Sequence, residues 1–296
     1  MSIETLQHCP VCEHTSFTPH FTCTDFVASG EAFHLVRCNN CRLVFTNPRP
    51  DADGIARYYQ SQHYVSHAGK KKGLIYLLYD VVRNISLRKK ADTISSFSTK
   101  GKLLDVGCGL GYFLHHMVKE GWNAQGVDIS ADARAYVKET FNLDVLPEQD
   151  LEKLGEGQYN VITMWHVLEH VHLLRDRVKL LKKLLAKNGT LFVAVPNSDA
   201  WEVSFYREYW DGFDVPRHIY HFNHSSVEYL MHSCGLNVVA KKPMIFDAYY
   251  ISWRSEIHRK NPLGFFRAMV IGQWSNWMAR RKKNYSSVLY VIQHAE

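Results

Sequence analysis

The chain has 296 residues and a formal net charge of +6, and its hydrophobic share of 46% and charged share of 22% are those of a globular protein. No apolar stretch approaches the ~20 residues that span a bilayer, which excludes a transmembrane segment. The basic runs at 70–72, 88–90 and 280–283 are short and scattered, which argues against a nucleic-acid-binding protein. The N-terminus begins polar and reaches cysteines at once, so we expect no signal peptide and a cytoplasmic location.

The first 50 residues are rich in cysteine and differ from the rest of the chain. They hold two C-x-x-C pairs and two short β-prone runs, at 33–37 and 43–46, and they end at N-P-R-P. In a reducing compartment such pairs are typical of a metal site rather than of disulfides. Four thiolates at this spacing suit tetrahedral Zn²⁺. We therefore predict a zinc-ribbon-like module over 1–50 with a structural zinc ion, held by Cys9, Cys12, Cys38 and Cys41.

Two alternatives to zinc remain for this module, a reduced and metal-free state and a redox role. Four histidines could replace a thiolate ligand: His8, His14, His20 and His34. Cys23 has no partner at matching spacing, so we interpret it as an ordinary small buried residue.

Residues 51–98 are predicted to form a helical linker or cap. The pattern indicates helices at about 55–65 and 74–97. In the second helix, six apolar residues share one face: Leu74, Leu77, Leu78, Val81, Val82 and Ile85. We expect this face to pack against the main domain.

From Lys102 onward, strands and helices alternate through a domain at 99–296. Strands are predicted at 102–106, 124–127, 143–146, 161–164, 191–195, 236–241 and 288–294, and helices at 112–120, 131–140 and 173–185. This rhythm predicts an α/β fold with a parallel sheet and helices on both faces. An aromatic-rich insertion at about 247–285 interrupts it before the last strand.

A glycine-rich turn follows the first of these strands. Residues 105–111 read D-V-G-C-G-L-G, and glycines at alternate positions let the backbone approach a ligand without Cβ atoms in the way. The spacing is not the G-x-G-x-x-G of dinucleotide sites. Asp128 follows the next strand, where a carboxylate can accept both hydroxyls of a ribose. Helix capping is the alternative role for Asp105 and Asp128.

Four segments together resemble the motif series of class I, Rossmann-like S-adenosylmethionine-dependent methyltransferases. They are residues 105–111, Asp128, W-H-V-L-E-H-V at 165–171 and V-P-N at 195–197. The resemblance implies a seven-stranded, mostly parallel sheet whose last strand is antiparallel. It implies a cofactor site made by Asp105, Gly107, Cys108, Gly109, Gly111, Asp128, Ile129, Gln149, Asp150, Trp165 and His166. Glu148 competes with Gln149 and Asp150 for the contact with adenine.

The same resemblance places the acceptor chemistry in two loops. P-R-H-I-Y-H-F at 216–222 resembles a bacterial subgroup of these enzymes. Because an imidazole suits proton removal near neutral pH, we predict His218 as general base, with His221 and His166 as further candidates. The two loop histidines could instead only hydrogen-bond loop carbonyls. The spacing of His166 and His170 gives little support to a metal site there.

Four residues are predicted to contact the substrate: Trp210, Arg217, Tyr220 and Asn197. Arg217 could bind a phosphate or carboxylate of the acceptor, or could equally hold Asp214. N-terminal zinc modules of this kind occur in bacterial methyltransferases of sugar, polysaccharide and natural-product pathways. The resemblance therefore implies methyl transfer to oxygen or nitrogen of a small-molecule, sugar or glycan-precursor acceptor.

Other partners and functions stay open at this point. The Asn/Asp-Pro-Pro-aromatic motif of enzymes that methylate DNA base nitrogens is absent after the fourth strand, which argues against DNA as acceptor. The alternatives are an RNA methyltransferase that uses the zinc module as a clamp, and a non-catalytic cofactor-binding scaffold. The insertion at 247–285 could cap the acceptor pocket, join two chains in a homodimer, or lie on the inner face of an anionic membrane.

Overall fold

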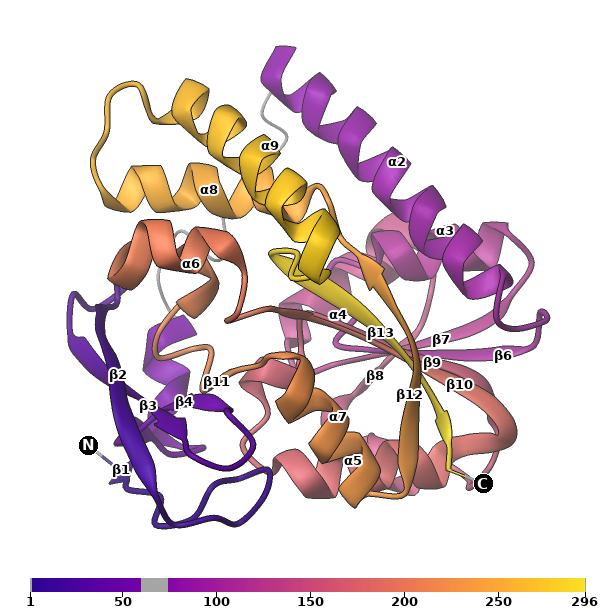
Figure 1. Cartoon of the computed structure of the whole chain (residues 1–296). Helices are drawn as coiled ribbons and strands as arrows, with labels where there is room; N and C mark the ends of the chain where they lie inside the picture. Colours follow the sequence, from indigo (N-terminus) through magenta and orange to yellow (C-terminus); the bar gives the residue numbers. More distant parts are fainter. Residues whose placement is uncertain (1, 60–73, 296) are drawn as a thin grey trace.

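A seven-stranded sheet forms the centre of the molecule (Figure 1). The computed structural model describes residues 2–59 and 74–295. The strands of this sheet are β6 (Lys102–Val106), β7 (Asn123–Asp128), β8 (Val145–Pro147), β9 (Tyr159–Trp165), β10 (Leu185–Pro196), β12 (Leu236–Pro243) and β13 (Ser287–His294). Their order is β12-β13-β10-β9-β6-β7-β8. The last strand, β13, is antiparallel to both neighbours, whereas β10, β9, β6, β7 and β8 pair in parallel, so the predicted fold class is confirmed.

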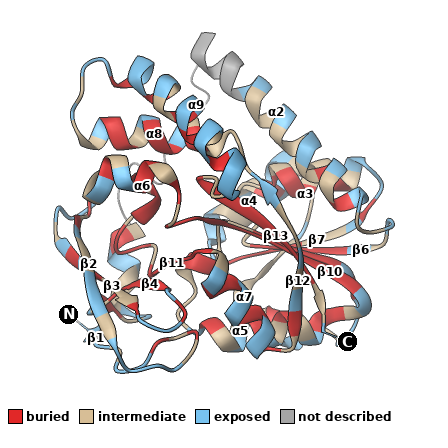
Figure 2. Ribbon diagram, in the orientation of Figure 1, coloured by how far each residue is buried: buried red, intermediate tan, exposed pale blue. Residues whose placement is uncertain are grey.

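Helices cover both faces of the sheet because the side chains of each strand alternate between them. On one face, Leu191, Val193 and Val195 of β10 pack with α5 (Leu174–Leu184) and α7 (His224–Ser233). On the other, Phe192 and Ala194 pack with α2 (Leu74–Ser95) and α3 (Tyr112–Lys119). Figure 2 shows the resulting buried strands between half-exposed helices.

The remaining helical segments are short or lie at the edges of the sheet. They are α4 (Ala131–Phe141), α6 (Trp201–Tyr206), and the 3₁₀ turns η1 (Gly54–Tyr59), η3 (Glu148–Lys153), η4 (Leu168–His170), η5 (Arg207–Tyr209) and η6 (Asp211–Phe213). The helix predicted at 55–65 is thus a 3₁₀ turn up to Tyr59, and the rest of it lies outside the described residues.

Of the residues predicted to pack on α2 that can be compared, Val82 is half-buried, but the other two are exposed. Val81 is 49% and Ile85 41% exposed, while the side chains of the earlier members, Leu74 to Leu78, lie outside those described. The contact with the main domain is made one to three turns later, where Ala91 and Ile94 are buried. The first half of α2 projects away from the sheet (Figure 1).

The N-terminal module is built into the rest of the molecule. Its sheet has the order β11-β4-β3-β2, with β2 (Phe17–Thr24), β3 (Ala32–Cys38) and β4 (Val44–Thr46) from the module. The fourth strand, β11 (Tyr220–His221), comes from the loop after β10. A second small sheet pairs β1 (Ile3–Glu4) with β5 (Arg49–Pro50). The module's buried side chains belong to the same clusters as those of the main domain, so residues 1–50 share a core with it.

The insertion before β13 is a helical hairpin of α8 (Asp247–His258) and α9 (Gly264–Lys282). Small residues of α9 face inward: Gly264, Ala268, Gly272, Ser275 and Ala279. A Cβ at Gly272 would lie 2.9 Å from the Cα of Tyr249, so the two backbones approach closely. Large side chains of α9 face outward at helical spacing: Phe266, Val270, Trp274 and Trp277. Of the helices described, none is long and apolar enough to cross a lipid bilayer.

Candidate active site

The glycine turn between β6 and α3 has three glycines with left-handed backbone. Gly107 has φ +73° and Gly111 φ +71°, and a Cβ would clash with Val167 at the first (2.4 Å) and with Val137 at the second (2.6 Å). Gly109 has φ +53°, but a Cβ there would meet no atom of residues 2–59 or 74–295 within 4 Å. The outer glycines are therefore required by protein packing, whereas Gly109 borders open space that a ligand can fill.

Asp128 lies directly against this turn. Its Oδ2 accepts a hydrogen bond from the Gly109 N–H at 2.7 Å, and its Oδ1 accepts one from Ser130 N–H at 2.9 Å. Ile129, next in the chain, is 77% exposed beside it. The structure thus brings together the turn, the carboxylate and an exposed apolar side chain, which is the arrangement that the sequence predicts for a nucleoside. Cys108 also lies in this turn, where its N–H donates to the Val127 carbonyl.

Asp105 is buried beneath the turn and accepts a hydrogen bond from Thr163 Oγ1 at 2.6 Å. Burial outweighs this bond and raises the pKa of Asp105 to about 7. The Lys90 ammonium of α2 lies 4.1 Å from the centre of the Trp165 ring. In the sequence, Lys90 belongs to the short basic run at 88–90. No pattern in the sequence shows that the end of α2 reaches Trp165, so this contact could not be predicted.

The three polar residues that are candidates for the contact with adenine differ in whether they already form an ion pair. Glu148 is ion-paired with Arg177, and Asp150 with Lys153 at 2.6 Å. Gln149, between them, is exposed. Contacts of Gln149 and Asp150 with the cofactor remain predictions.

His166 follows β9 with a positive φ of 56° and lies between two carboxylates. Its Nε2 is 3.1 Å from Asp247 Oδ2 and its Nδ1 is 3.4 Å from Glu169 Oε1. Burial alone would lower the pKa of His166, but the two carboxylates outweigh it and raise the pKa to about 9. At neutral pH this imidazole is therefore charged and holds no lone pair for an acceptor proton. Asp247 begins the insertion, and nothing in the sequence indicates that it reaches this site.

His218 and His221 occupy different surroundings. Nδ1 of His218 lies 2.9 Å from the Gly212 carbonyl, and its Nε2 lies 4.0 Å from Glu169 Oε1. His221 is buried in β11, with Nε2 3.5 Å from Thr46 Oγ1. Burial and the neighbouring His218 hold the pKa of His221 well below its usual range. Of the three predicted bases, His221 is buried and His166 lies between two carboxylates that keep it charged, whereas His218 is partly exposed and has one buried carboxylate nearby.

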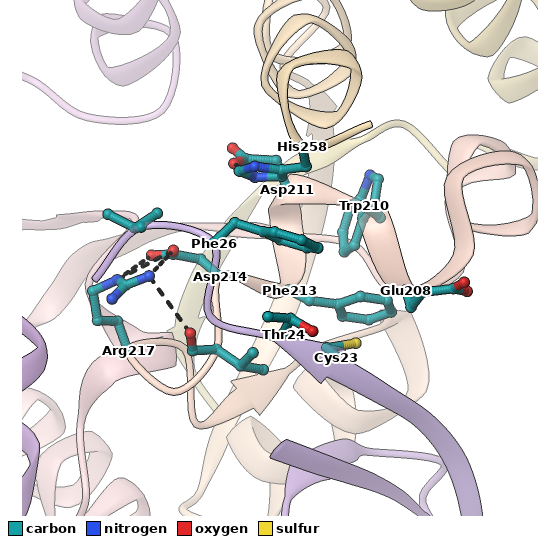
Figure 3. A pocket seen from close by; sticks show the side chains of 12 residues that line it. Cys23, Thr24, Phe26, Glu208, Trp210, Asp211, Phe213, Asp214, Arg217 and His258 are labelled. Carbon is teal, nitrogen blue, oxygen red and sulfur yellow. Dashed lines mark hydrogen bonds and ion pairs between the residues drawn. The ribbon is translucent and has the colours of Figure 1, made fainter. Parts of the chain in front are cut away.

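The four residues predicted to contact substrate are buried and have internal partners. Trp210 donates to Glu202, Tyr220 to the His172 carbonyl, and Asn197 to the Tyr285 carbonyl. Arg217 pairs with Asp214 at 2.6 Å, as Figure 3 shows, and with Asp25 at 2.9 Å. Arg217 thus joins the acceptor loop to the N-terminal module, and a substrate contact for these residues remains a prediction.

The four predicted zinc ligands converge at one point. Their Sγ atoms all lie within 4.8 Å of one another: Cys9, Cys12, Cys38 and Cys41. The Sγ atoms of Cys9 and Cys41 are 3.5 Å apart, as are those of Cys12 and Cys38. Cys23 is buried outside this group, and burial raises the pKa of its thiol to about 12. The donor set and its compactness fit a tetrahedral ion.

A family model described as a methyltransferase domain matches residues 76–241, more than half of the chain. The chain belongs to this family. Its cofactor is S-adenosylmethionine, which fits the open face of Gly109 and the carboxylate of Asp128. The match extends from α2 through β12 and leaves the cysteine module and the α8–α9 hairpin outside it.

Curated relatives include the ubiquinone biosynthesis O-methyltransferases of Erwinia tasmaniensis and Cronobacter sakazakii. The first is 36% identical over 34% of this chain and 45% of that protein, and the second is 33% identical over 33% and 44%. The chain thus matches less than half the length of either relative.

Among solved structures, a Haemonchus contortus phosphoethanolamine N-methyltransferase complexed with S-adenosylmethionine is similar, with a TM-score of 0.53 and 14% identity. The similarity covers 86% of this chain and 63% of that one. A S-adenosylmethionine-dependent methyltransferase from Archaeoglobus fulgidus has a TM-score of 0.50 and 17% identity, covering 74% and 99%. At this identity the two likenesses support the fold.

Proposed function

We propose that this methyltransferase transfers its methyl group to an oxygen of a small-molecule or glycan-precursor acceptor. The observation that carries the proposal is the Gly109–Asp128 contact, which forms a cradle for the cofactor beside the loops that hold His166 and His218. Oxygen is favoured over nitrogen because the curated relatives are O-methyltransferases.

The cofactor supplies an activated methyl group, and the residues of the chain align it and exclude water. The Gly109 backbone lies against the methionine part of the cofactor, and the Asp128 carboxylate holds its ribose. Trp165 lies at the end of β9, where the sulfonium end of the cofactor is expected. We assign the removal of the acceptor's proton to His218 with Glu169, because His166 is charged and His221 is buried.

Calorimetry with S-adenosylhomocysteine tests the cofactor site. Replacing Asp128 with Ala should weaken binding ~10- to 100-fold, because a hydrogen bond to a charged group contributes ~1.5–3 kcal/mol. Asp132→Ala, on the exposed first turn of α4, is the matched control. Methyl transfer to phenolic or sugar hydroxyls is then measured by the release of S-adenosylhomocysteine. Undetectable binding by the unaltered protein would rule out the proposal.

We further propose that the four-cysteine group holds one structural Zn²⁺. Four donors leave no open position, so the ion would cross-link the loops before β2 and between β3 and β4 without taking part in the reaction. Metal analysis should show that Cys9→Ser with Cys12→Ser removes one zinc per chain, while Cys23→Ser retains it. Equal zinc content in all three proteins would contradict the assignment.

We also propose that the outer face of the α8–α9 hairpin rests on an anionic lipid surface. Its exposed apolar residues are Tyr250, Trp253, Ile257, Phe265, Phe266, Val270, Trp274 and Trp277. Between 248 and 283 the chain has eight Lys and Arg residues, and its one acidic residue, Glu256, is buried. Apolar side chains beside a basic cluster are the combination that anionic membranes attract.

A further inference from the structure

We propose that Glu169, His170 and His218 bind a divalent transition-metal ion next to the transferred methyl group, separate from the cysteine site. The proposal rests on the proposed oxygen methylation, for which the ion would bind the acceptor hydroxyl. With the ion bound, Nε2 of His218 is a ligand, and solvent takes the acceptor's proton in place of His218. Each of the three residues offers one ligand atom, and these atoms lie within 4.8 Å of one another. Two come from η4, directly after β9, and the third from the loop that follows η6.

The spacing suits a single ion. A histidine nitrogen and a carboxylate oxygen on opposite sides of one Zn²⁺ lie ~4.3 Å apart at most, since the two bonds are ~2.1 and ~2.2 Å long. Nε2 of His218 and Oε1 of Glu169 are 4.0 Å apart, which is already within this limit. The rings of His170 and His218 meet edge to face with centroids 4.7 Å apart, so both can direct a nitrogen to one point.

The Glu169 carboxylate is the strongest indication of a missing cation. The residue is 0% exposed, and apart from the contact of its Oε1 with Nδ1 of His166 at 3.4 Å, neither of its oxygens has a hydrogen-bond partner within 2–59 or 74–295. Burying a carboxylate without such bonds costs several kcal/mol, so natural proteins almost always provide a counter-charge. The ring of His166 also contacts Asp247, since its Nε2 lies 3.1 Å from Asp247 Oδ2.

Both histidines are held in the orientation that metal ligands need. Nδ1 of His170 lies 2.9 Å from the Arg217 carbonyl and 3.0 Å from Tyr59 Oη, and Nδ1 of His218 lies 2.9 Å from the Gly212 carbonyl. A carbonyl only accepts, so Nδ1 of each ring carries the proton and Nε2 keeps its lone pair. A backbone carbonyl on the far nitrogen is the usual support of a metal-bound histidine.

The donor set indicates the class of ion and its use. Two imidazoles and one carboxylate suit Zn²⁺, Mn²⁺, Fe²⁺ or Co²⁺ better than Mg²⁺, which prefers oxygen donors. Three protein ligands leave a position for the acceptor oxygen, whose proton would pass to solvent as the pKa of the hydroxyl falls. The oxygen then forms the new C–O bond, the C–S bond breaks, and the sulfonium becomes a neutral thioether.

Cobalt titration of the full-length protein, supplied with one equivalent of zinc for the cysteine site, tests this site independently of activity. Co²⁺ should bind at one site per chain and give visible d–d absorption without a sulfur-to-cobalt charge-transfer band. Glu169→Gln and His218→Asn should each weaken Co²⁺ binding at least 100-fold. His232→Asn, on the exposed side of α7, is the control and should bind Co²⁺ unchanged.

Calorimetry with S-adenosylhomocysteine on the same variants separates this proposal from the proposed function. Cofactor binding that survives in Glu169→Gln or His218→Asn shows an intact fold, so loss of Co²⁺ then belongs to the metal site. If one variant does not fold, the other carries the test. The metal proposal is overturned if the unaltered protein binds no Co²⁺ outside the cysteines, or if both variants bind it as well as the control does.

Discussion

Gly109 combines a left-handed backbone with a face on which no atom of the described residues lies within 4 Å of the position of a Cβ. We expect Gly109→Ala to abolish most cofactor binding, because its Cβ would stand in the cradle, and to cost ~1–2 kcal/mol of stability for the positive φ. Gly157→Ala is the matched control, since Gly157 has φ +63° and open space outside the site. Calorimetry and thermal unfolding would check both. Equal loss of cofactor affinity in the two variants would contradict a role for the open face.

His166 makes stability depend on pH in a defined direction. Its pKa rises from about 6.5 in the unfolded chain to about 9 in the folded protein, so the folded state binds the extra proton between these values. Its contribution to the free energy of unfolding is complete below pH ~6.5 and is lost as the pH rises through ~9. The melting temperature of the unaltered protein should therefore fall more steeply across this window than that of His166→Asn. Parallel curves would show that His166 is uncharged.

At the residue scale, the sequence predicts contacts within one motif better than contacts between distant segments. The Gly109–Asp128 pair follows from two strand ends that lie side by side in any parallel sheet. Asp247 and Lys90 reach the site from the hairpin and from α2, whose positions depend on packing that no local pattern records. The sequence leaves two partners possible for Arg217, the substrate and Asp214. The structure adds a third, Asp25, from the N-terminal module.

At the scale of elements, Arg217 connects the turn after β2 to the loop before β11. Its guanidinium and the Asp25 carboxylate are fully buried, so Arg217→Met would leave Asp25 without its counter-charge. We expect a loss of ~3–5 kcal/mol in the free energy of unfolding. The exposed pair of Arg42 and Asp199, 3.9 Å apart, provides the comparison, since Arg42→Met should cost below ~1 kcal/mol. Denaturant unfolding measures both, and similar losses would show that the buried pair contributes little.

Strands and helices with a clear period are predictable from the sequence, and elements fixed by distant partners are not. The strand predicted at 102–106 coincides with β6, and 288–294 lies within β13, because their apolar runs are long enough to fix a period. The two residues of β11 have no such pattern and become a strand only by pairing with β4. The apolar period of α2 does not show which turns pack on the main domain, because it runs through turns that project beyond the sheet.

At the scale of the whole molecule, the proposed lipid contact of the α8–α9 hairpin should attach the protein to membranes. The protein should co-float with vesicles that contain anionic lipid, less with neutral ones, and less again in high salt. Trp274→Ala with Trp277→Ala should weaken binding at least tenfold because two exposed rings are lost. Tyr229→Ala removes an exposed ring from α7 and should have no effect. Equal binding to neutral vesicles, or a dimer that the double substitution dissociates, would contradict the proposal.

The shared sheet of the N-terminal module has a consequence for protein synthesis. During translation β4 emerges early, but β11 follows only after most of the methyltransferase domain has been made. Until then the nascent chain carries an open strand edge, which can pair with other chains. Residues 1–50 thus leave the ribosome before β11 but complete their sheet only after it, and residues 1–50 expressed alone would keep that edge permanently.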